Sequence, residues 1–281
     1  MTIKTVSVLG AGVLGSQIAF QTAFHGFDVI AYDVSREALT KSHTTIAWMI
    51  EQMAKDQTGT EYDFDAAQQR IGFTTVLADA VRKADLVIEA VPERIDIKRE
   101  AYRKIAAVAR PETIFATNSS TLLPSALAED TGRPDRFVAL HFANEIWRHN
   151  VAEVMGHPGT SPEVIATVTQ FATDIGMVPV VLHKEQPGYV LNSLLIPLLG
   201  AAAKLLGKGI AAPRDIDRTW KIGTGAPKGP FDIFDIVGLN TVHNIMASGD
   251  PEERHFAELL RENYIDKGFL GVASGRGIYQ Y

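Results

Sequence analysis

The sequence predicts an α/β fold, a doubly wound sheet with helices on both faces, followed by an all-helical segment. Up to about residue 184, short apolar runs alternate with stretches of helical periodicity, which is typical of a parallel sheet. A glycine-rich turn joins the first apolar run to the first helical stretch. Beyond Lys184 only helical periodicity remains.

The expected strands are short and rich in aliphatic residues. The first, Thr5–Leu9, runs into glycines, and the helix after it, Ser16–His25, stops at a glycine. The second, Asp28–Tyr32, precedes a helix that Ser35 caps and that runs to about Lys55. Further strands are expected at Gly72–Thr75, Leu86–Val91, Thr113–Thr117, Arg136–His141, Val151–Met155 and Val178–Leu182.

Helices are expected between the later strands, most clearly over Ile97–Val108 and Pro162–Ile175, and polar Gln57–Asp65 is expected to be a loop. The Lys-Glu-Gln-Pro-Gly run that starts at Lys184 breaks the alternation. It divides the chain into two expected domains, 1–185 and 186–281. The helices expected in the second domain are Val190–Leu206, Pro213–Lys221, Phe231–Met246 and Pro251–Tyr264.

Composition narrows the class of protein. The chain has 281 residues, which suggests about two domains of roughly 150 residues. Its 27 basic and 33 acidic residues give a net charge of −6, which disfavours a nucleic-acid partner. It has no cysteine, so disulfides and thiolate chemistry are excluded. The histidines lack metal-ligand spacing, and we expect no metal.

The sequence shows no targeting or membrane segment. It opens on a strand-like pattern, without the charged and apolar regions of a signal peptide. The longest apolar run, Leu194–Leu206, is interrupted by Pro197 and Lys204 and is too short to span a bilayer. We therefore expect a cytoplasmic protein.

The glycine-rich turn reads Gly10-Ala11-Gly12-Val13-Leu14-Gly15 and fits the G-x-G-x-x-G pattern. It follows a strand and opens a helix, the context of a Rossmann-like dinucleotide site. Gly10 permits the tight turn, Gly12 lets the backbone approach a pyrophosphate, and Gly15 allows close helix–sheet packing. A glycine turn without a ligand is the alternative, and the strand–turn–helix context disfavours it.

Asp33 ends the second strand of this unit. A carboxylate there accepts hydrogen bonds from both ribose hydroxyls and repels a 2′-phosphate. We therefore expect NAD rather than NADP as the cofactor, although the nearby Arg36 weakens this preference.

Six further stretches follow in a fixed order: Ile88–Glu93 (IEAVPE), Thr117–Ser120 (TNSS), Leu140–Asn144 (LHFAN), Val151–Val154 (VAEV), Pro187–Asn192 (PGYVLN) and Gly229–Asp232 (GPFD). After the glycine-rich turn, this ordered set resembles the L-3-hydroxyacyl-CoA dehydrogenase family, of the 3-hydroxybutyryl-CoA dehydrogenase type. The resemblance covers nearly the whole chain, and the final Ser274–Tyr281 is similar to the family's TGEGFYKY ending. It implies a helical domain that builds a homodimer and a role in fatty acid metabolism.

The resemblance implies a set of catalytic and substrate residues. The family's catalytic serine, two residues after the asparagine of N-T-S-S, matches Ser120, and the histidine that opens H-F-F-N matches His141. The glutamate of L-V-E-V matches Glu153, and the asparagine after P-G-F matches Asn192. Ser42 aligns with a substrate serine, and Ser120 and Asn192 are expected to contact substrate as well. The residues implied beside the nicotinamide and its ribose are Ala90, Glu93, Lys98, Asn118 and Asn144.

The chemistry of these residue types supports the same roles. Oxidising a secondary alcohol needs a base for the hydroxyl proton, and histidine is suited to that task. A carboxylate at Glu153 would orient the His141 ring, and Ser120 and Asn192 would bond the reacting oxygen. Simpler readings stay open: a structural histidine, a helix cap at Ser120, a surface Glu153 and a solvent-facing Asn192.

Three departures from the family bear on the substrate. The family's H-F-F-N-P-V-P-V-M-K-L-V-E reads H-F-A-N-E-I-W-R-H-N-V-A-E from His141 to Glu153, so polar residues replace apolar ones. Residues 41–70 hold three basic and five acidic side chains, where the family places lysines that meet CoA phosphates. The lysine before the closing motif is Ala273 here.

We expect oxidation of an L-3-hydroxyacyl-CoA, or of a small polar 3-hydroxy acid like L-gulonate or carnitine. A catalytically silent NAD-binding sensor is the alternative of another class, and the full set of catalytic residues disfavours it. An enzyme of the β-hydroxyisobutyrate type is disfavoured because that group uses a catalytic lysine in a different motif.

Overall fold

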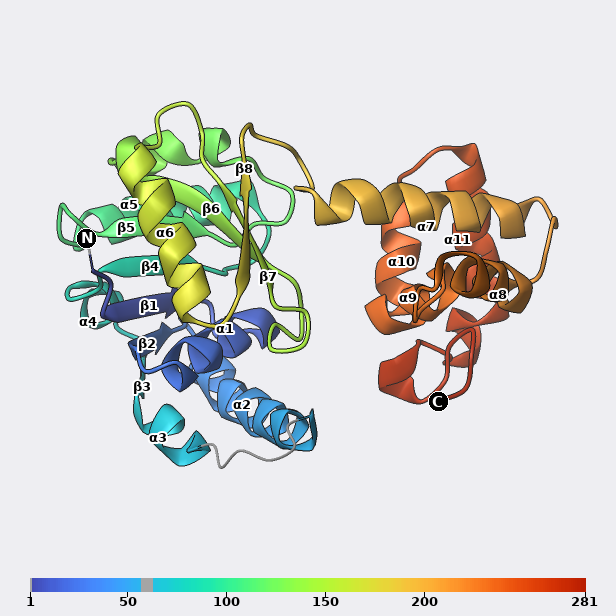
Figure 1. The fold of residues 1–281 in the computed structure, drawn as a ribbon, viewed down its shortest axis with the longest axis horizontal. Helices are drawn as coiled ribbons and strands as arrows, with labels where there is room; N and C mark the ends of the chain where they lie inside the picture. Colours follow the sequence, from blue (N-terminus) through green and yellow to red (C-terminus); the bar gives the residue numbers. More distant parts are fainter. Residues whose placement is uncertain (1, 57–62) are drawn as a thin grey trace. The chain divides into compact units, whose positions relative to one another are not determined.

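The computed structural model describes residues 2–56 and 63–281. They form two compact units that meet in sequence at Val190 and Leu191, and each is described by itself. The first unit contains one eight-stranded sheet in the order β3-β2-β1-β4-β5-β6-β7-β8 (Figure 1). Its strands are β1 Thr5–Leu9, β2 Asp28–Tyr32, β3 Ile71–Thr74, β4 Leu86–Glu89, β5 Ile114–Thr117, β6 Phe137–Phe142, β7 Val151–Met155 and β8 Val178–Leu182.

The doubly wound α/β fold predicted from the sequence is confirmed, with one difference in strand direction. Strands β1 to β6 are parallel, but β7 pairs antiparallel with β6, and β8 then runs parallel to β7. The alternation of strands and helices had predicted a parallel sheet throughout. The connection from β6 to β7, residues 143–150, is too short for a parallel crossover, which needs about a dozen residues or more.

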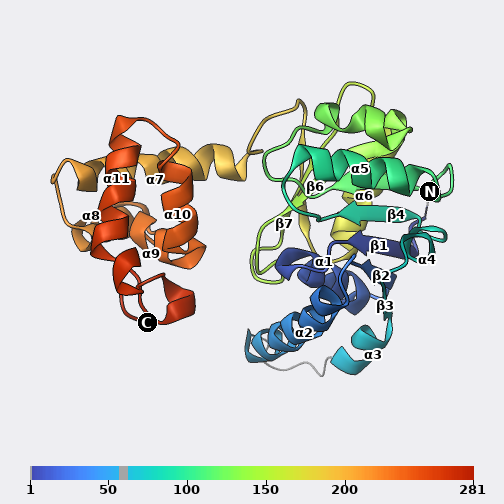
Figure 2. The same ribbon diagram turned by 180° about the vertical axis from the view of Figure 1, so that it is seen from behind.

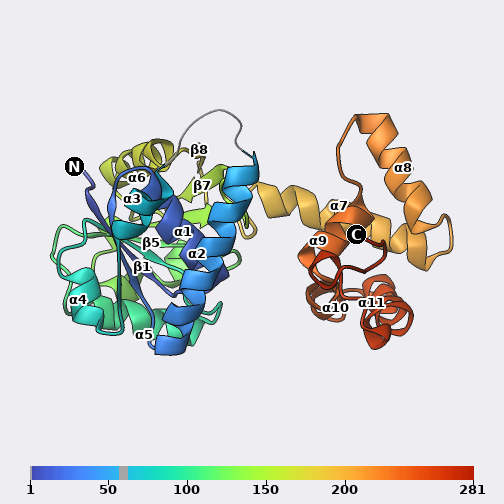
Figure 3. The ribbon, with the colours of Figure 1, turned by 90° about the horizontal axis from the view of Figure 1, so that it is seen from below.

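Helices cover both faces of the sheet. On one face, α1 (Val13–Phe24), α2 (Arg36–Asp56) and α6 (Pro162–Asp174) pack over a core that contains Ile18 and Met49. On the other, α4 (Leu77–Val81) and α5 (Ile95–Ala106) cover a second core around Tyr102 and Ile105. Figure 1 shows α6 in front of the strands, and Figure 2 shows α5 on the opposite side. The view in Figure 3 places the strands between α6 and α5, with α2 beside α1.

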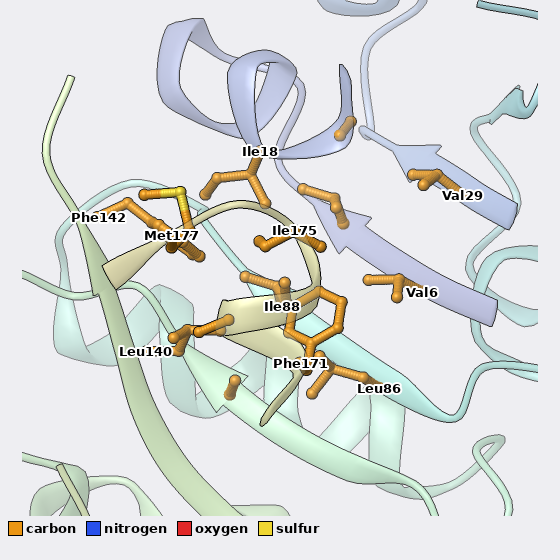
Figure 4. Packing of buried hydrophobic residues seen from close by; sticks show 14 of the residues in the cluster. Val6, Ile18, Val29, Leu86, Ile88, Leu140, Phe142, Phe171, Ile175 and Met177 are labelled. Carbon is orange, nitrogen blue, oxygen red and sulfur yellow. The ribbon is translucent and has the colours of Figure 1, made fainter. Parts of the chain in front are cut away.

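The larger core joins the central strands to α1 and α6. Val6 and Ile88, from neighbouring strands, lie with Ile18 of α1 and Phe171 of α6 (Figure 4). All four are buried, which removes their apolar surface from water. This packing fixes α1, and hence the glycine-rich turn before it, against the sheet.

Some predicted boundaries differ from the structure. The loop expected over Gln57–Asp65 lies mostly outside the described residues, and a short helix, α3 (Phe64–Gln69), begins within its last part. Asp63 caps α3 by accepting a hydrogen bond from the backbone of Ala66 at 2.8 Å. The strand expected at Gly72–Thr75 begins one residue earlier, at Ile71.

The second unit is helical, as predicted. Its helices are α7 Leu191–Gly207, α8 Pro213–Thr224, α9 Pro230–Val237, α10 Leu239–Met246 and α11 Pro251–Asn263. The prediction of a single helix over Phe231–Met246 is wrong, because the chain is broken at Gly238 into two helices, α9 and α10. Gly238 has φ = +89°, a backbone conformation that residues with a side chain rarely adopt. The core of this unit includes Phe231, Phe234 and Phe256.

Two buried aspartates hold the end of the described chain in the second unit. Asp217 accepts hydrogen bonds from the backbone of Phe231 and from the Tyr279 hydroxyl, at 2.8 and 3.0 Å. Asp235 accepts from the backbone of Tyr279 at 2.8 Å and from the Tyr281 hydroxyl at 3.0 Å. Both carboxylates are thereby satisfied despite their burial.

Strand β8 forms one edge of the sheet. Its Val178, Val180 and Val181 are exposed, and Pro179 stands between them, opposite Ala152 of β7.

Within residues 2–56 and 63–281, none of the helices combines the length and the apolar character that a membrane span requires.

Candidate active site

At two of the three glycines of the turn, Gly10 and Gly15, a side chain would collide with the protein's own backbone. Gly10 has φ = +99°, and a Cβ added there would lie 2.5 Å from the carbonyl oxygen of Ala90. A Cβ on Gly15 would lie 1.9 Å from the carbonyl oxygen of Gly10. The backbone of Gly10 also donates to the carbonyl of Tyr32 at 2.8 Å, which joins the turn to the end of β2. A turn this close to a helix start is a suitable cradle for a dinucleotide pyrophosphate.

The predicted cofactor residues of the turn lie at the N-terminus of α1. Gly12 is its N-cap, and Val13 and Leu14 are its first residues. The first turn holds no acidic residue, so the positive end of the helix dipole is not neutralised there. Asp33 accepts hydrogen bonds from the backbone of Ala11 at 2.9 Å and of Ser35 at 3.0 Å. Its carboxylate is therefore held beside the turn.

Asn118 ties together the ends of three strands. Its backbone donates to the carbonyl of Glu89, at the end of β4, at 2.8 Å. Its side-chain oxygen accepts from the backbone of Phe142, at the end of β6, at 3.0 Å. Parallel strands end at the same edge of a sheet, and ligands of doubly wound folds bind at that edge. Ala90 directly follows β4, and the exposed Asn144 lies two residues after the end of β6.

Glu93 organises the loop that carries Ser120. Its Oε1 accepts hydrogen bonds from the hydroxyl of Ser119, from the backbone of Ser120 at 3.0 Å, and from the backbone and hydroxyl of Thr121 at 3.0 and 2.8 Å. Burial opposes its ionisation, but these hydrogen bonds and the charge of Lys98 outweigh burial and lower the pKa of Glu93. Glu93 is therefore an anion at neutral pH.

Lys98 lies beneath the site rather than on its surface. It is 1% exposed, and its Nζ lies 2.6 Å from Oε1 of Glu89 and 3.2 Å from Oε2 of Glu93. Glu89 also accepts from the hydroxyls of Tyr102 at 3.2 Å and Thr117 at 2.8 Å. The resemblance assigned no role to Glu89, although the I-E-A-V-P-E stretch contains it. Lys98 and Glu89 can influence a cofactor only through Glu93 and the strand ends.

Ser120, His141 and Glu153 lie in one hydrogen-bonded chain. Nδ1 of His141 is 3.0 Å from Oε2 of Glu153, and Nε2 is 3.1 Å from Oγ of Ser120. His141 and Glu153 are buried, and they are direct partners in the antiparallel β6–β7 pairing. Directly opposed residues on paired strands project to the same face of the sheet. The strand direction that the sequence did not predict is what brings them together.

The arrangement defines which ring nitrogen carries the proton. An ionised Glu153 can only accept a hydrogen bond, so Nδ1 of His141 donates to it. Nε2 is then an acceptor, and the Ser120 hydroxyl donates to it. A group with an unprotonated Nε2, aimed at the ligand-binding edge and backed by a carboxylate, can take a proton from an alcohol.

Two neighbours of this chain, Tyr189 and Val190, are not predicted by the sequence. The ring of Tyr189 stacks on the ring of His141 with centroids 4.4 Å apart and an interplanar angle of 11°. The backbone of Val190 donates to Oε1 of Glu153 at 2.8 Å. Pro187-Gly188 predicted a turn here, but a tight turn does not reveal where the next side chain points.

Two predicted substrate residues, Ser42 and Asn192, lie outside the hydrogen-bonded chain of Ser120, His141 and Glu153. Ser42 is fully buried, and its hydroxyl accepts from Ser16 at 2.8 Å between α2 and α1. This geometry gives no support to contact between Ser42 and substrate. Asn192 belongs to the second unit, on the first turn of α7, and its role stays a prediction.

The polar residues that replace the family's apolar ones tie the β6–β7 connection to α2. Nε1 of Trp147 donates to Asp56 at 3.1 Å, and Arg148 pairs with Asp56 at 2.5 Å and with Glu145 at 2.9 Å. The ring of Trp147 meets that of Trp48 edge to face, 5.7 Å between centroids. The hydrogen bonds that Arg148 donates to Asp56 and Glu145 raise the pKa of Arg148 above its already high value. Most of these polar side chains therefore bond to other residues of the protein.

A dinucleotide cradle and an imidazole at one edge of a doubly wound sheet define the class, an NAD-dependent oxidoreductase. Profiles of the 3-hydroxyacyl-CoA dehydrogenase NAD binding domain and C-terminal domain match residues 5–186 and 188–281. The chain belongs to the 3-hydroxyacyl-CoA dehydrogenase family, which confirms the resemblance, and its cofactor is NAD.

Relatives include both CoA-ester dehydrogenases and a diketone reductase. A probable 3-hydroxybutyryl-CoA dehydrogenase of Bacillus subtilis is 34% identical, over 100% of this chain and 98% of the relative. The solved (S)-3-hydroxybutyryl-CoA dehydrogenase of Ralstonia eutropha is 34% identical, with a TM-score of 0.84, over 100% of this chain and 99% of that one. A solved diketoreductase, described as acting on dicarbonyl compounds, is 57% identical, with a TM-score of 0.94, over all of both chains.

We predict that Gly15→Ala abolishes NADH binding. The new methyl group would meet the carbonyl oxygen of Gly10 at 1.9 Å, so the turn must open and the cradle is lost. Gly72→Ala is the control, because its Cβ would meet only the Val29 carbonyl oxygen at 3.9 Å. The measurement is NADH fluorescence titration of both variants. Unchanged NADH affinity in Gly15→Ala would contradict the assignment.

We predict that Glu93 stabilises the fold above about pH 4.3, the ordinary pKa of a glutamate. Its folded pKa lies below that value, so the ionised form is favoured by folding. The contribution is complete above the ordinary pKa and is lost as pH falls through the lowered folded pKa. Urea unfolding of wild type and Glu93→Gln should therefore differ most between pH 5 and 7, and the gap should narrow toward pH 3. Glu262→Gln, an exposed change on α11, is the control. A gap that is equal at pH 3 and 7 would contradict the prediction.

Proposed function

We propose that this enzyme interconverts an L-3-hydroxyacyl group and the corresponding 3-ketoacyl group, with a His–Glu acid–base pair. The observation that carries the proposal is the chain from Ser120 through His141 to Glu153 at the ligand-binding edge of the sheet. The family indicates the reaction type, and several relatives are named as dehydrogenases of a 3-hydroxyacyl-CoA.

In the oxidative direction, Nε2 of His141 takes the proton of the 3-hydroxyl. NAD, when bound, accepts the hydride from C3. Glu153 holds the ring through Nδ1 and stabilises the imidazolium that forms. The Ser120 hydroxyl bonds the reacting oxygen, and Asn192 is proposed to do so from the second unit. The products are a ketone, a reduced nicotinamide and a proton on His141.

The residues of the site fit NAD. At the second glycine of the turn, Gly12, no protein atom lies within 4 Å of the Cβ position, which leaves the open space that a pyrophosphate approach requires. Asp33 places a carboxylate beside that turn, where it can accept from ribose hydroxyls. We propose that Glu93 and Asn118, and the neighbouring Ala90 and Asn144, contact the nicotinamide end, with Lys98 acting through Glu93.

A second substrate class is favoured by two observations. The 57% identical solved relative is named for dicarbonyl compounds without mention of CoA. The exposed basic residues of α2, Arg36, Lys41 and Lys55, are matched by three exposed acidic residues of the same helix, Glu37, Glu51 and Asp56. Few free cations remain there for a coenzyme with several phosphates. Small 3-hydroxy or 1,3-dicarbonyl compounds without CoA are therefore the alternative substrates.

We propose that a second copy of this chain covers part of the second unit. Helix α7 exposes Leu194 and Ile196, which are 70% and 52% exposed, and α8 exposes Ile222. An apolar groove lined by Leu198, Leu205, Ile216 and Trp220 runs between α7 and α8. Exposed apolar surface of this extent is typical of an interface between subunits.

We predict that His141→Asn lowers kcat by about 10²–10⁴-fold, the usual contribution of a general base. NADH binding should persist, because His141 lies outside the glycine-rich turn. The matched control is His243→Asn, on α10 of the second unit. Turnover is followed by NADH absorbance, and binding by NADH fluorescence. More than about a tenth of wild-type activity in His141→Asn would reject the proposed base.

The same assay separates the substrate classes. The panel is acetoacetyl-CoA, the acetoacetyl thioester of N-acetylcysteamine, free acetoacetate, L-gulonate and carnitine. We expect turnover of both thioesters, with kcat/KM values within about tenfold, or about 1.4 kcal/mol. A larger advantage for acetoacetyl-CoA would show that the CoA phosphates are recognised. Turnover of the free acids alone would reject the thioester assignment.

We predict that the protein is a dimer of twice 30.6 kDa in light scattering after gel filtration. Leu194→Glu and Ile222→Glu should shift it to the mass of one chain, because each places a charge at an exposed apolar position of the second unit. Val108→Glu, at an exposed apolar position of the first unit, is the control. A wild-type mass of one chain would contradict the proposed dimer.

A further inference from the structure

The turn before α7 holds a tyrosine in a costly conformation. Gly188 has φ = +79° and Tyr189 has φ = +55°, so two consecutive residues are left-handed. For a residue with a bulky side chain this costs about 1–3 kcal/mol, and it persists only where the surroundings determine it. The only other residue with a side chain and positive φ among those described is Glu145. The contacts of Tyr189 should therefore explain why the turn adopts this conformation.

The ring of Tyr189 is buried against the imidazole. It is 1% exposed and stacks almost parallel on His141, with 4.4 Å between ring centroids. Its hydroxyl donates to the carbonyl of Ser119 at 2.7 Å, directly before Ser120. Burial, and then the charges of Glu93, Glu153 and Glu89, raise the pKa of Tyr189, so the hydroxyl keeps its proton at neutral pH. Behind the ring lie Ala139 and Met155.

Tyr189 and Val190 contact two members of the hydrogen-bonded chain directly, His141 and Glu153, and reach the third, Ser120, through the residue before it. Tyr189 contacts His141 through its ring and the Ser120 loop through its hydroxyl. Val190 donates its backbone N–H to Oε1 of Glu153, the oxygen that does not face His141. The Glu153 carboxylate is therefore fixed from both sides.

We propose that Tyr189 is a positioning residue, whose ring holds the His141 imidazole in the plane where Nδ1 meets Glu153 and Nε2 meets Ser120. The proposal rests on the function proposed above for His141. The two hydrogen bonds of the imidazole lie in its ring plane, and they leave some freedom to tilt out of that plane. A flat ring packed on one face removes this freedom. The hydroxyl anchors the tyrosine in place but does not itself align the imidazole.

A positioning role predicts an effect on kcat rather than on KM. A misaligned base slows proton transfer, and a displacement of about 1 Å can cost about 10²-fold in rate. If Tyr189 only aligns the imidazole, the binding of substrate and of NADH does not depend on the tilt of that ring. We therefore expect Tyr189→Leu to lower kcat about 10- to 100-fold and to leave KM and NADH affinity within about threefold. Tyr189→Phe keeps the ring and should retain kcat within about threefold, the loss of one neutral hydrogen bond.

The control separates alignment from packing. Leu182→Ala removes a side chain that packs on the same small cluster of Ala139, Met155 and Tyr189. It should lower the melting temperature while leaving kcat within about twofold. Tyr189→Met is the substitute if Tyr189→Leu does not fold, as judged by circular dichroism. The substrate is whichever compound of the panel above the wild type turns over fastest.

A second readout does not depend on activity. Long-range ¹⁵N–¹H correlations of the imidazole report which nitrogen of His141 carries the proton. We expect one tautomer, protonated at Nδ1, in wild type and Tyr189→Phe, and a mixture in Tyr189→Leu or Tyr189→Met. An unchanged tautomer in the last two variants would overturn the proposal.

The outcomes separate a failure of the positioning role of Tyr189 from a failure of the proposed function. Wild-type kcat in folded Tyr189→Leu, an equal loss in Leu182→Ala, or equal losses in Tyr189→Phe and Tyr189→Leu would each overturn the positioning role. If His141→Asn is inactive in the same experiment, the proposed function stands and only this inference fails. If His141→Asn is active, the proposed function fails, and the tautomer measurement still tests whether Tyr189 aligns the ring.

Discussion

The active site depends on the antiparallel register of β6 and β7. That register sets His141 directly opposite Glu153, so the two side chains leave the sheet on the same face and meet at 3.0 Å. A slip of one residue would turn one of them to the other face. The burial of every residue of β6 makes such a slip unfavourable. The alignment of His141 and Glu153, the proposed acid–base pair, is therefore a property of the sheet, with the backbone of Val190 adding a second restraint on Glu153.

Much of the fold could be predicted because it rests on local patterns. Alternating apolar runs and helices identified the doubly wound unit, and G-x-G-x-x-G placed the cradle between β1 and α1. The direction of β7 could be predicted less well, since it depends on the length of the connection after β6 rather than on the strand itself. The break at Gly238 was missed for a similar reason. A glycine within a helical pattern is often tolerated, and only its positive φ distinguishes this one.

The geometry of the candidate site could be predicted where the side-chain type of a residue suits the proposed chemistry. His141, Glu153 and Ser120 have side-chain types that suit proton transfer, and they lie within hydrogen-bond distance of one another. Residues that act by packing or pairing were harder to place. Lys98 is a buried partner of Glu89, Ser42 fills a contact between two helices, and Tyr189 is aimed by a turn. Such roles follow from three-dimensional neighbours, which one sequence does not contain.

The edge strand β8 has a consequence for association between molecules. Its three exposed valines make it suited to adding further strands, which is how sheets recruit other chains. A proline within a paired strand is tolerated where its missing N–H would point away from the neighbouring strand. Pro179 therefore removes a donor from the open side of the sheet, in the middle of β8. The sheet that carries His141 and Glu153 is in this way protected from being extended by a foreign strand.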